Sequence, residues 1–214
     1  FYNYYFNVDT SLYFNPASTV KLPLAFLSLE KLHRMKAKGI DKFTRIQIDS
    51  NETWESPVTI DSTSEDYYPS IAHYIKKAFL ISDNDAYNRM YQFVGQQSIN
   101  RILHAKGYPS TRITRQFLGL NADQNRHTNA IRFLDPTGRL IYLQPPACNT
   151  DSFFTKEVKI GKQHYNASDS LVNAPIDFSK ANNLPLEDLQ QLLQTVLFPA
   201  SVPAYRRFDL GKDD

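Results

Sequence analysis

The stretch Asn15-Pro16-Ala17-Ser18-Thr19-Val20-Lys21 marks the point where the chain passes from extended segments into a helix. From Thr19 to Lys38 the apolar residues recur on an unusually wide stripe, which predicts a helix buried on most sides. Pro23 is tolerated there because it falls in the first turn. Before this stretch, residues 1–8 and 12–14 are rich in tyrosine and phenylalanine, and we expect two strands joined by a tight turn.

Ser18 and Lys21 lie three residues apart at the start of this helix, so both project from one face. A serine hydroxyl becomes a good nucleophile only when a neighbouring base takes its proton. A lysine can be that base if burial and nearby positive potential lower its pKa, and a helix N-terminus supplies such potential. The spacing alone is weak evidence, because Ser28 and Lys31 repeat it in mid-helix, where we expect Glu30 and Lys31 to be solvated.

A second motif, Ser82-Asp83-Asn84, interrupts two helical patterns. The simplest role for serine or aspartate at such a break is to cap the helix that follows, here one that begins near Asp85. Capping leaves the neighbouring side chains available for catalysis.

Together, the two motifs resemble those of the class A β-lactamase and penicillin-binding protein superfamily, whose signature set is S-x-x-K, S-D-N and K-T-G. The segment 14–21 is similar to the family's junction around the nucleophile, and 82–88 is similar to its second motif. The resemblance implies an α+β, serine β-lactamase-like fold with the helical subdomain largely present and the antiparallel sheet incomplete. It covers about residues 1–128 and resumes near 175–198. We therefore expect one incomplete catalytic domain over 1–214, with 129–174 as an insertion.

Residue by residue, the resemblance implies the following roles. Ser18 would attack a carbonyl and form an acyl-enzyme, with Lys21 as general base and the Ser18 backbone N–H as half of the oxyanion hole. Ser82 would pass a proton to the leaving nitrogen. Asn84 would hydrogen-bond to Lys21 and to the amide carbonyl of the substrate, and Asp83 would be structural.

The third motif is missing, because Lys212 is followed by Asp213 and Asp214 and no K-[ST]-G occurs elsewhere. We expect that the chain stops before the strand that would carry this motif. On that expectation, these residues alone would lack part of their sheet and would lack activity.

The segment 111–121 aligns without gaps to the family's omega loop. The alignment matches Arg115 and Asn121 to the family's arginine and asparagine, which implies that Asn121 binds substrate. We expect Asp177 to be the salt-bridge partner of Arg115. The position of the deacylating glutamate is Phe117, however, and a phenylalanine cannot activate water. Asp123 is the nearest carboxylate and is the candidate substitute. Without such a base, acylation would proceed while hydrolysis of the acyl-enzyme would be slow.

The leading hypothesis is thus an active-site-serine hydrolase that acylates on a β-lactam or similar amide and hydrolyses it. One alternative is a penicillin-binding D,D-peptidase or transpeptidase. Another is a β-lactam sensor that acylates without turnover, or a surface protein that kept the fold without the chemistry.

The composition limits which classes of binding partner the protein is expected to have. The formal net charge is +2, too small to indicate nucleic acid, and the single cysteine excludes an internal disulfide and a zinc-finger spacing. The five histidines show no ligand spacing, so we expect no metal and no cofactor. The expected partner is a small-molecule β-lactam or a peptidoglycan-like peptide bound to a monomer. Export to the bacterial periplasm or envelope is implied by the resemblance.

Elsewhere the pattern predicts short strands at 46–48 and 58–60, a loop over 108–128 and a hairpin over 130–143 with its turn at Asp135–Gly138. Residues 145–180 are predicted to be rich in loops. Further helices are predicted at 70–80, 86–94, 98–105 and 186–197.

Overall fold

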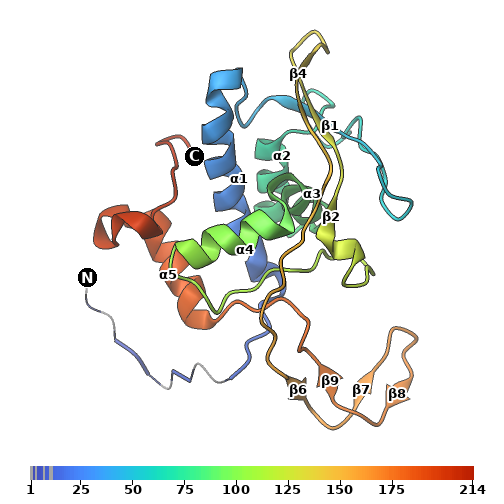
Figure 1. Ribbon diagram of the computed structural model, residues 1–214, viewed down its shortest axis with the longest axis vertical. Helices are drawn as coiled ribbons and strands as arrows, with labels where there is room; N and C mark the ends of the chain where they lie inside the picture. Colours follow the sequence, from blue (N-terminus) through green and yellow to red (C-terminus); the bar gives the residue numbers. More distant parts are fainter. Residues whose placement is uncertain (1, 3, 7, 10–11) are drawn as a thin grey trace.

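The computed structural model describes residues 2, 4–6, 8–9 and 12–214. Helices occupy the centre of the molecule, and a three-stranded sheet lies against them (Figure 1). The α-helices are α1 (Lys21–Met35), α2 (Ile71–Leu80), α3 (Asn84–Val94), α4 (Gln96–Ala105) and α5 (Leu186–Leu197). Short 3-10 helices are η1 (Ala17–Val20), η2 (Lys36–Lys38), η3 (Gln124–Arg126), η4 (Pro199–Ser201) and η5 (Ala204–Arg206).

The largest sheet is antiparallel, with strand order β1-β3-β4. Its strands are β1 (Arg45–Ile48), β3 (Ile131–Leu134) and β4 (Leu140–Gln144). The predicted hairpin over 130–143 is confirmed by the pairing of β3 with β4. Ile46 pairs with Phe133, and both side chains are fully buried, which turns this face of the sheet toward the helices.

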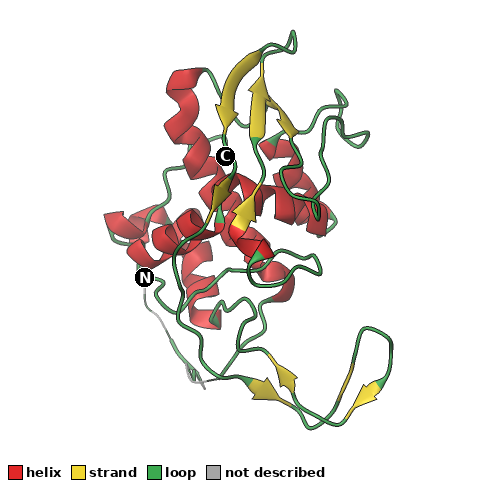
Figure 2. Cartoon of the chain, turned by 45° about the vertical axis from the view of Figure 1, so that its right-hand side comes forward, coloured by secondary structure: helices red, strands yellow, loops and turns green. Residues whose placement is uncertain are grey.

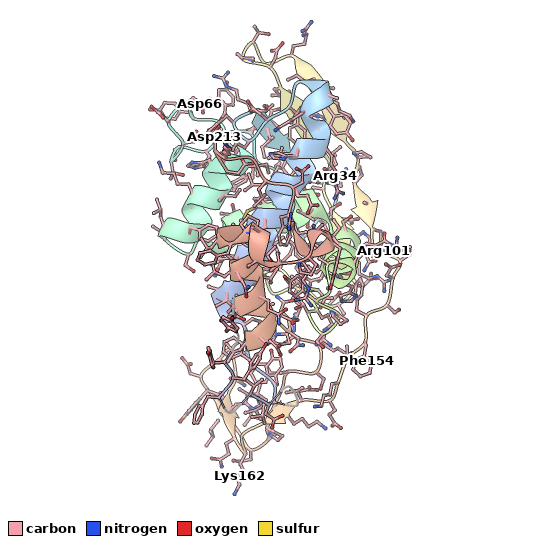
Figure 3. All side chains as sticks on the ribbon, turned by 90° about the vertical axis from the view of Figure 1, so that its left-hand side faces the viewer. Arg34, Asp66, Arg101, Phe154, Lys162 and Asp213 are labelled. Carbon is pink, nitrogen blue, oxygen red and sulfur yellow. The ribbon has the colours of Figure 1, made fainter. Side chains whose placement is uncertain are left out.

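The remaining strands have two residues each and form three separate pairs. They are β2 (His127–Thr128) with β5 (Ala147–Cys148), β6 (Lys159–Ile160) with β9 (Ile176–Asp177), and β7 (His164–Tyr165) with β8 (Leu171–Val172). The last two pairs form an arm that projects away from the helical body (Figure 2), with Lys162 at its outer end (Figure 3). The segment 129–174 supplies two strands of the largest sheet, β3 and β4.

The core forms where α3 packs against α1 and α2, and where a ring of α3 reaches the sheet. α3 is buried along nearly its whole length, since every residue from Ala86 to Val94 is buried. Phe93 of α3 meets Phe133 of β3 with ring centroids 5.9 Å apart. The wide apolar stripe of α1 is explained by this central position, as α1 buries eleven of its fifteen residues.

The predicted helices at 70–80, 86–94 and 186–197 are confirmed as α2, α3 and α5. α4 begins two residues earlier than the predicted 98–105, directly after Gly95, whose φ of 86° ends α3. The predicted loop at 108–128 contains only η3 and the two-residue β2. The prediction that residues 145–180 are rich in loops did not include the short strand pairs β6–β9 and β7–β8. Of 58–60, only Val58 pairs, through a single bridge to Ile48.

The two strands predicted at 1–8 and 12–14 are wrong for the described residues of these segments, which adopt no strand. Tyr2, Tyr4 and Phe6 are 87%, 92% and 95% exposed. A strand needs a paired neighbour, and no described strand lies against this segment. Residues 1, 3, 7 and 10–11, which include most of the expected turn, lie outside the described residues.

Candidate active site

Ser18 lies on η1, and the backbone of residues 15–19 forms a tight turn there. The backbone N–H and the hydroxyl of Thr19 both donate to the carbonyl of Pro16, and Asn15 Oδ1 accepts from the Ala17 N–H at 3.2 Å. Ala17 has a φ of 41°, a left-handed conformation that costs energy for a residue with a Cβ. This turn presents Ser18 to solvent, while Lys21 begins α1 and is only 3% exposed.

Ser82 lies in the break between α2 and α3, again with a left-handed φ, of 54°. The side chain of Asp83 accepts from the Ala86 N–H at 2.8 Å and caps the N-terminus of α3. The structural role predicted for Asp83 is thereby confirmed. Asn84 is the first residue of α3 and is exposed. Because α3 packs against α1, this second motif lies beside the first (Figure 1).

The two motifs meet at the side-chain nitrogen of Lys21. Its Nζ lies 3.1 Å from Ser18 Oγ, 2.8 Å from Ser82 Oγ and 2.9 Å from Asn84 Oδ1, and it also donates to the Ser82 carbonyl. Ser82 Oγ lies 3.0 Å from Ser18 Oγ. The structure thus brings together four of the five predicted site residues, Ser18, Lys21, Ser82 and Asn84.

A neutral amine at Lys21 could use all of its hydrogen-bonding capacity in this cluster. Four oxygens surround Nζ, and a neutral amine has two N–H groups and one lone pair. The Ser82 carbonyl and the Asn84 amide oxygen are acceptors only, so they can take the two N–H groups of a neutral amine. Its lone pair is then free to accept from a serine hydroxyl. Burial lowers the pKa of Lys21 from its ordinary value, opposed by the negative charge of Asp83.

Phe117 lies against this cluster, with Lys21 Nζ 5.3 Å from its ring centroid. Its backbone N–H donates to Asn88 Oδ1 at 2.8 Å, and its ring packs on Tyr87 at 4.6 Å. The loop therefore holds an apolar ring beside Lys21. Asp123, the carboxylate considered as a substitute, is exposed and precedes η3. A cavity of about 250 Å³ runs from Ala17 along this loop, lined by Asn15, Pro16, Ala17, Arg115, Gln116, Phe117, Leu118, Ala181 and Asn182.

The structure does not bring Asn121 to the cluster. Asn121 is exposed, and its side chain accepts from the Gln124 N–H at 2.9 Å, at the turn that leads into η3. The predicted pair of Arg115 and Asp177 is wrong: among the described residues neither forms an ion pair with the other. Arg115 instead donates to the Leu120 carbonyl at 3.4 Å, and Asp177 lies on the arm formed by β6 and β9.

Asn125 performs the loop-closing role that the sequence did not reveal. It is buried, its Nδ2 donates to the carbonyls of Leu120 and Asn121, and its Oδ1 accepts from the Gln116 N–H. No local pattern distinguishes this asparagine from its neighbours, because its partners are backbone groups.

The second S-x-x-K spacing forms no comparable pair. Ser28 is fully buried and its hydroxyl has no hydrogen-bond partner. The expectation that Glu30 and Lys31 are solvated is wrong, because α1 is surrounded by other elements. Glu30 is 6% exposed and pairs with Lys106 at 3.2 Å. Lys31 donates to Gln144 Oε1 at 2.7 Å, and burial lowers its pKa to about 8.

Within the described residues, no three His, Cys, Asp or Glu side chains are grouped so that they could hold a metal ion. The described helices also include none with the length and apolar character needed to cross a membrane.

The helical body, the antiparallel sheet and the serine–lysine cluster together define an α+β fold of the serine β-lactamase kind. A family model described as "Beta-lactamase enzyme family" matches residues 2–139, so the chain belongs to this family of β-lactamase-like hydrolases. Comparisons with curated proteins and with solved structures found no match.

Proposed function

We propose that the protein is an active-site-serine hydrolase that forms an acyl-enzyme on Ser18 with a β-lactam or a similar amide. The observation that carries the proposal is the contact of Lys21 Nζ with both Ser18 Oγ and Ser82 Oγ, at 3.1 Å and 2.8 Å. A buried amine with a lowered pKa in contact with an exposed hydroxyl is a base positioned to activate a nucleophile.

The proposed reaction begins when the neutral amine of Lys21 takes the proton of the Ser18 hydroxyl. The Ser18 oxygen then attacks the amide carbonyl, and the Ser18 backbone N–H supports the oxyanion that develops. Ser82, whose hydroxyl contacts both Lys21 Nζ and Ser18 Oγ, returns the proton to the leaving nitrogen. The C–N bond breaks and the acyl group remains on Ser18. Asn84 holds Lys21 through its amide oxygen and offers its NH₂ group to the substrate.

Phe117 favours a second candidate within the same chemistry, a penicillin-binding D,D-peptidase, transpeptidase or sensor that releases its acyl group slowly. Its ring lies near Lys21 and cannot accept a proton from water. In either case the substrate is a small β-lactam or a peptidoglycan-like peptide, and the corresponding site of action is the bacterial envelope.

The proposal is tested by labelling with a fluorescent penicillin. We expect the full-length wild-type protein to carry one covalent label on Ser18 and the full-length Ser18→Ala variant to carry none. Ser28→Ala is the matched control, because it removes the serine of the other S-x-x-K spacing without removing a hydrogen bond. Equal labelling of the Ser18→Ala variant would refute the nucleophile assignment.

Mass spectrometry of the labelled protein over time separates the two candidates. If Phe117 leaves the site without a base for water, we expect the acyl group to be released from Ser18 over hours. The Ser28→Ala protein is expected to release it at the same rate. Release within seconds would instead establish efficient β-lactamase turnover and would contradict the inference from Phe117.

A further inference from the structure

Lys77, in the last turn of α2, contacts the break that carries Ser82 through both its main chain and its side chain. Its backbone carbonyl accepts from the N–H groups of Ile81 at 3.2 Å and Asp83 at 3.3 Å. Its Nζ pairs with Asp83 Oδ2 at 3.4 Å. One lysine thus binds the residues on either side of Ser82, whose φ of 54° is left-handed.

Both carboxylate oxygens of Asp83 are occupied. Oδ1 accepts from the Ala86 N–H at 2.8 Å and caps α3, and Oδ2 pairs with Lys77. Within the described residues, Asp83 forms no ion pair with Lys21, although Lys21 Nζ contacts the hydroxyl of the adjacent Ser82. Burial lowers the pKa of Lys21, and the Asp83 charge opposes this effect through space.

A direct ion pair between Asp83 and Lys21 would work against the proposed acylation. A carboxylate within about 4–6 Å stabilises the ammonium form of a lysine, and an ammonium cannot take the Ser18 proton. Lys77 competes with Lys21 for the Asp83 carboxylate, and its own positive charge disfavours a second ammonium nearby. Both effects favour the neutral amine.

A second carboxylate holds Lys77 in this place. Asp61 Oδ2 lies 3.3 Å from Lys77 Nζ, so the ammonium sits between Asp61 and Asp83. The side chains of Lys77, Asp61 and Asp83 are 17%, 12% and 20% exposed. Salt screens partly buried charges of this kind less than it screens exposed ones.

The other titratable groups around Lys77 and Asp83 have contacts of their own, are neutral or are exposed. Burial raises the pKa of Tyr74, so its hydroxyl stays neutral. The remaining groups are His73, which contacts Asp61, Asp85 paired with Arg89, Asp66 paired with Arg45, and the exposed Lys76 and Glu65.

We propose that Lys77 is a positioning residue for Lys21: it binds the Asp83 carboxylate, holds the turn that carries Ser82 and keeps this carboxylate from pairing with Lys21. Its effect on acylation rests on the proposed function, in which Lys21 is the base for Ser18. Lys77 lies outside both motifs and acts through Asp83, without contact to the substrate.

NMR titration of the lysine side chains in the full-length protein measures the pKa of Lys21 directly, with its signal assigned from a Lys21→Arg protein. We expect Lys77→Met to raise this pKa and Lys77→Arg, which keeps a cation for Asp83, to restore it. Lys76→Met is the matched control, because it removes an exposed charge from the same helix. An unchanged Lys21 pKa in folded Lys77→Met, or an equal rise in Lys76→Met, would overturn the proposal.

A double-mutant cycle tests whether Lys77 acts through Asp83. In an Asp83→Asn background, Lys77→Met is expected to raise the Lys21 pKa by at most about half as much as in the wild type. Equal rises in both backgrounds would contradict the assignment. Asp61→Asn leaves Lys77 to Asp83 alone and is expected to lower the Lys21 pKa. This variant keeps the inference testable if Lys77→Met does not fold, and a raised pKa would refute it.

The rate of penicillin labelling against pH separates positioning from a structural role. Lys77→Met is expected to label Ser18 about threefold more slowly at pH 7, because less Lys21 is neutral, and to reach the wild-type rate at high pH. A rate reduced by the same factor at every pH would overturn the proposal. A wild-type protein that does not label would refute the proposed function alone, because the NMR titration requires no acylation and decides the role of Lys77 by itself.

Discussion

At the scale of single residues, the proposed acylation of Ser18 depends on the protonation of Lys21. An ammonium cannot accept the Ser18 proton, so only the neutral fraction of Lys21 would act as the proposed base. Burial lowers the pKa of Lys21 and enlarges this fraction at neutral pH, while Asp83 acts in the opposite direction. The burial of Lys21 thus favours its neutral form. The Asp83 carboxylate, which caps α3, favours the charged form.

Acylation of Ser18 is expected to speed up as pH rises and to level off above the lowered pKa of Lys21. Removing the Asp83 charge lowers this pKa further, so Asp83→Asn is expected to move the rising limb to lower pH. Asparagine is also a good N-cap, which preserves α3. The measurement is the rate of penicillin labelling against pH, with Asp85→Asn as control. A limb that moves to higher pH would contradict this account of the site.

At the scale of elements, Asn125 determines the path of the loop that carries Phe117. Its side chain joins the start of the loop, at Gln116, to its end, at Leu120 and Asn121. The carbonyl of Asn125 also accepts from Tyr91 of α3 at 3.0 Å, which anchors the loop to the helical body. A turn made of backbone bonds to one buried amide holds its shape without regular secondary structure.

Asn125→Ala is expected to destabilise the protein by about 3 kcal/mol, because several buried backbone groups lose their partner at roughly 1–3 kcal/mol each. Asn121→Ala removes only an exposed capping contact and is expected to cost about 1 kcal/mol or less. Urea denaturation of the two variants measures both costs. Similar losses for the two asparagines would show that the loop is not held by Asn125.

At the scale of the whole molecule, the segment after α5 returns to α1 (Figure 1). Phe208 packs on Phe26 of α1 with ring centroids 5.4 Å apart, and Lys106 Nζ lies 4.6 Å from the Phe208 ring. This ring covers the buried pair of Lys106 with Glu30. Shielding of this kind strengthens an ion pair by keeping water away from it.

Phe208→Ala is expected to lower the free energy of unfolding by about 3 kcal/mol, the usual cost of deleting a buried phenylalanine ring. Phe154 is the matched control, because it is 86% exposed at the surface of the molecule (Figure 3). Phe154→Ala is expected to change stability by less than about 0.5 kcal/mol. Calorimetric unfolding gives both values, and a Phe208→Ala variant as stable as Phe154→Ala would exclude a packing role for this segment.

Local sequence predicted much of the helical body and the four residues that the structure brings together, Ser18, Lys21, Ser82 and Asn84. Helical spacing predicts α2 and α3, and Gly95 marks the end of α3, because the free energies involved are local. The motifs around Ser18 and Ser82 could be found because their neighbours in sequence form the turns that present them. The burial of Lys31 could not, since it depends on Gln144, far along the chain.

The sequence by itself determined the helices, the hairpin over 130–143 and the identity of the serine–lysine cluster. Only the tertiary structure decided that Asn121 faces solvent, that Arg115 and Asp177 do not pair, and that Asn125 closes the loop. It alone placed Lys77 between Asp61 and Asp83. The physical reason is range: periodicity and caps act within a few residues, whereas burial and ion pairing depend on which distant segments meet.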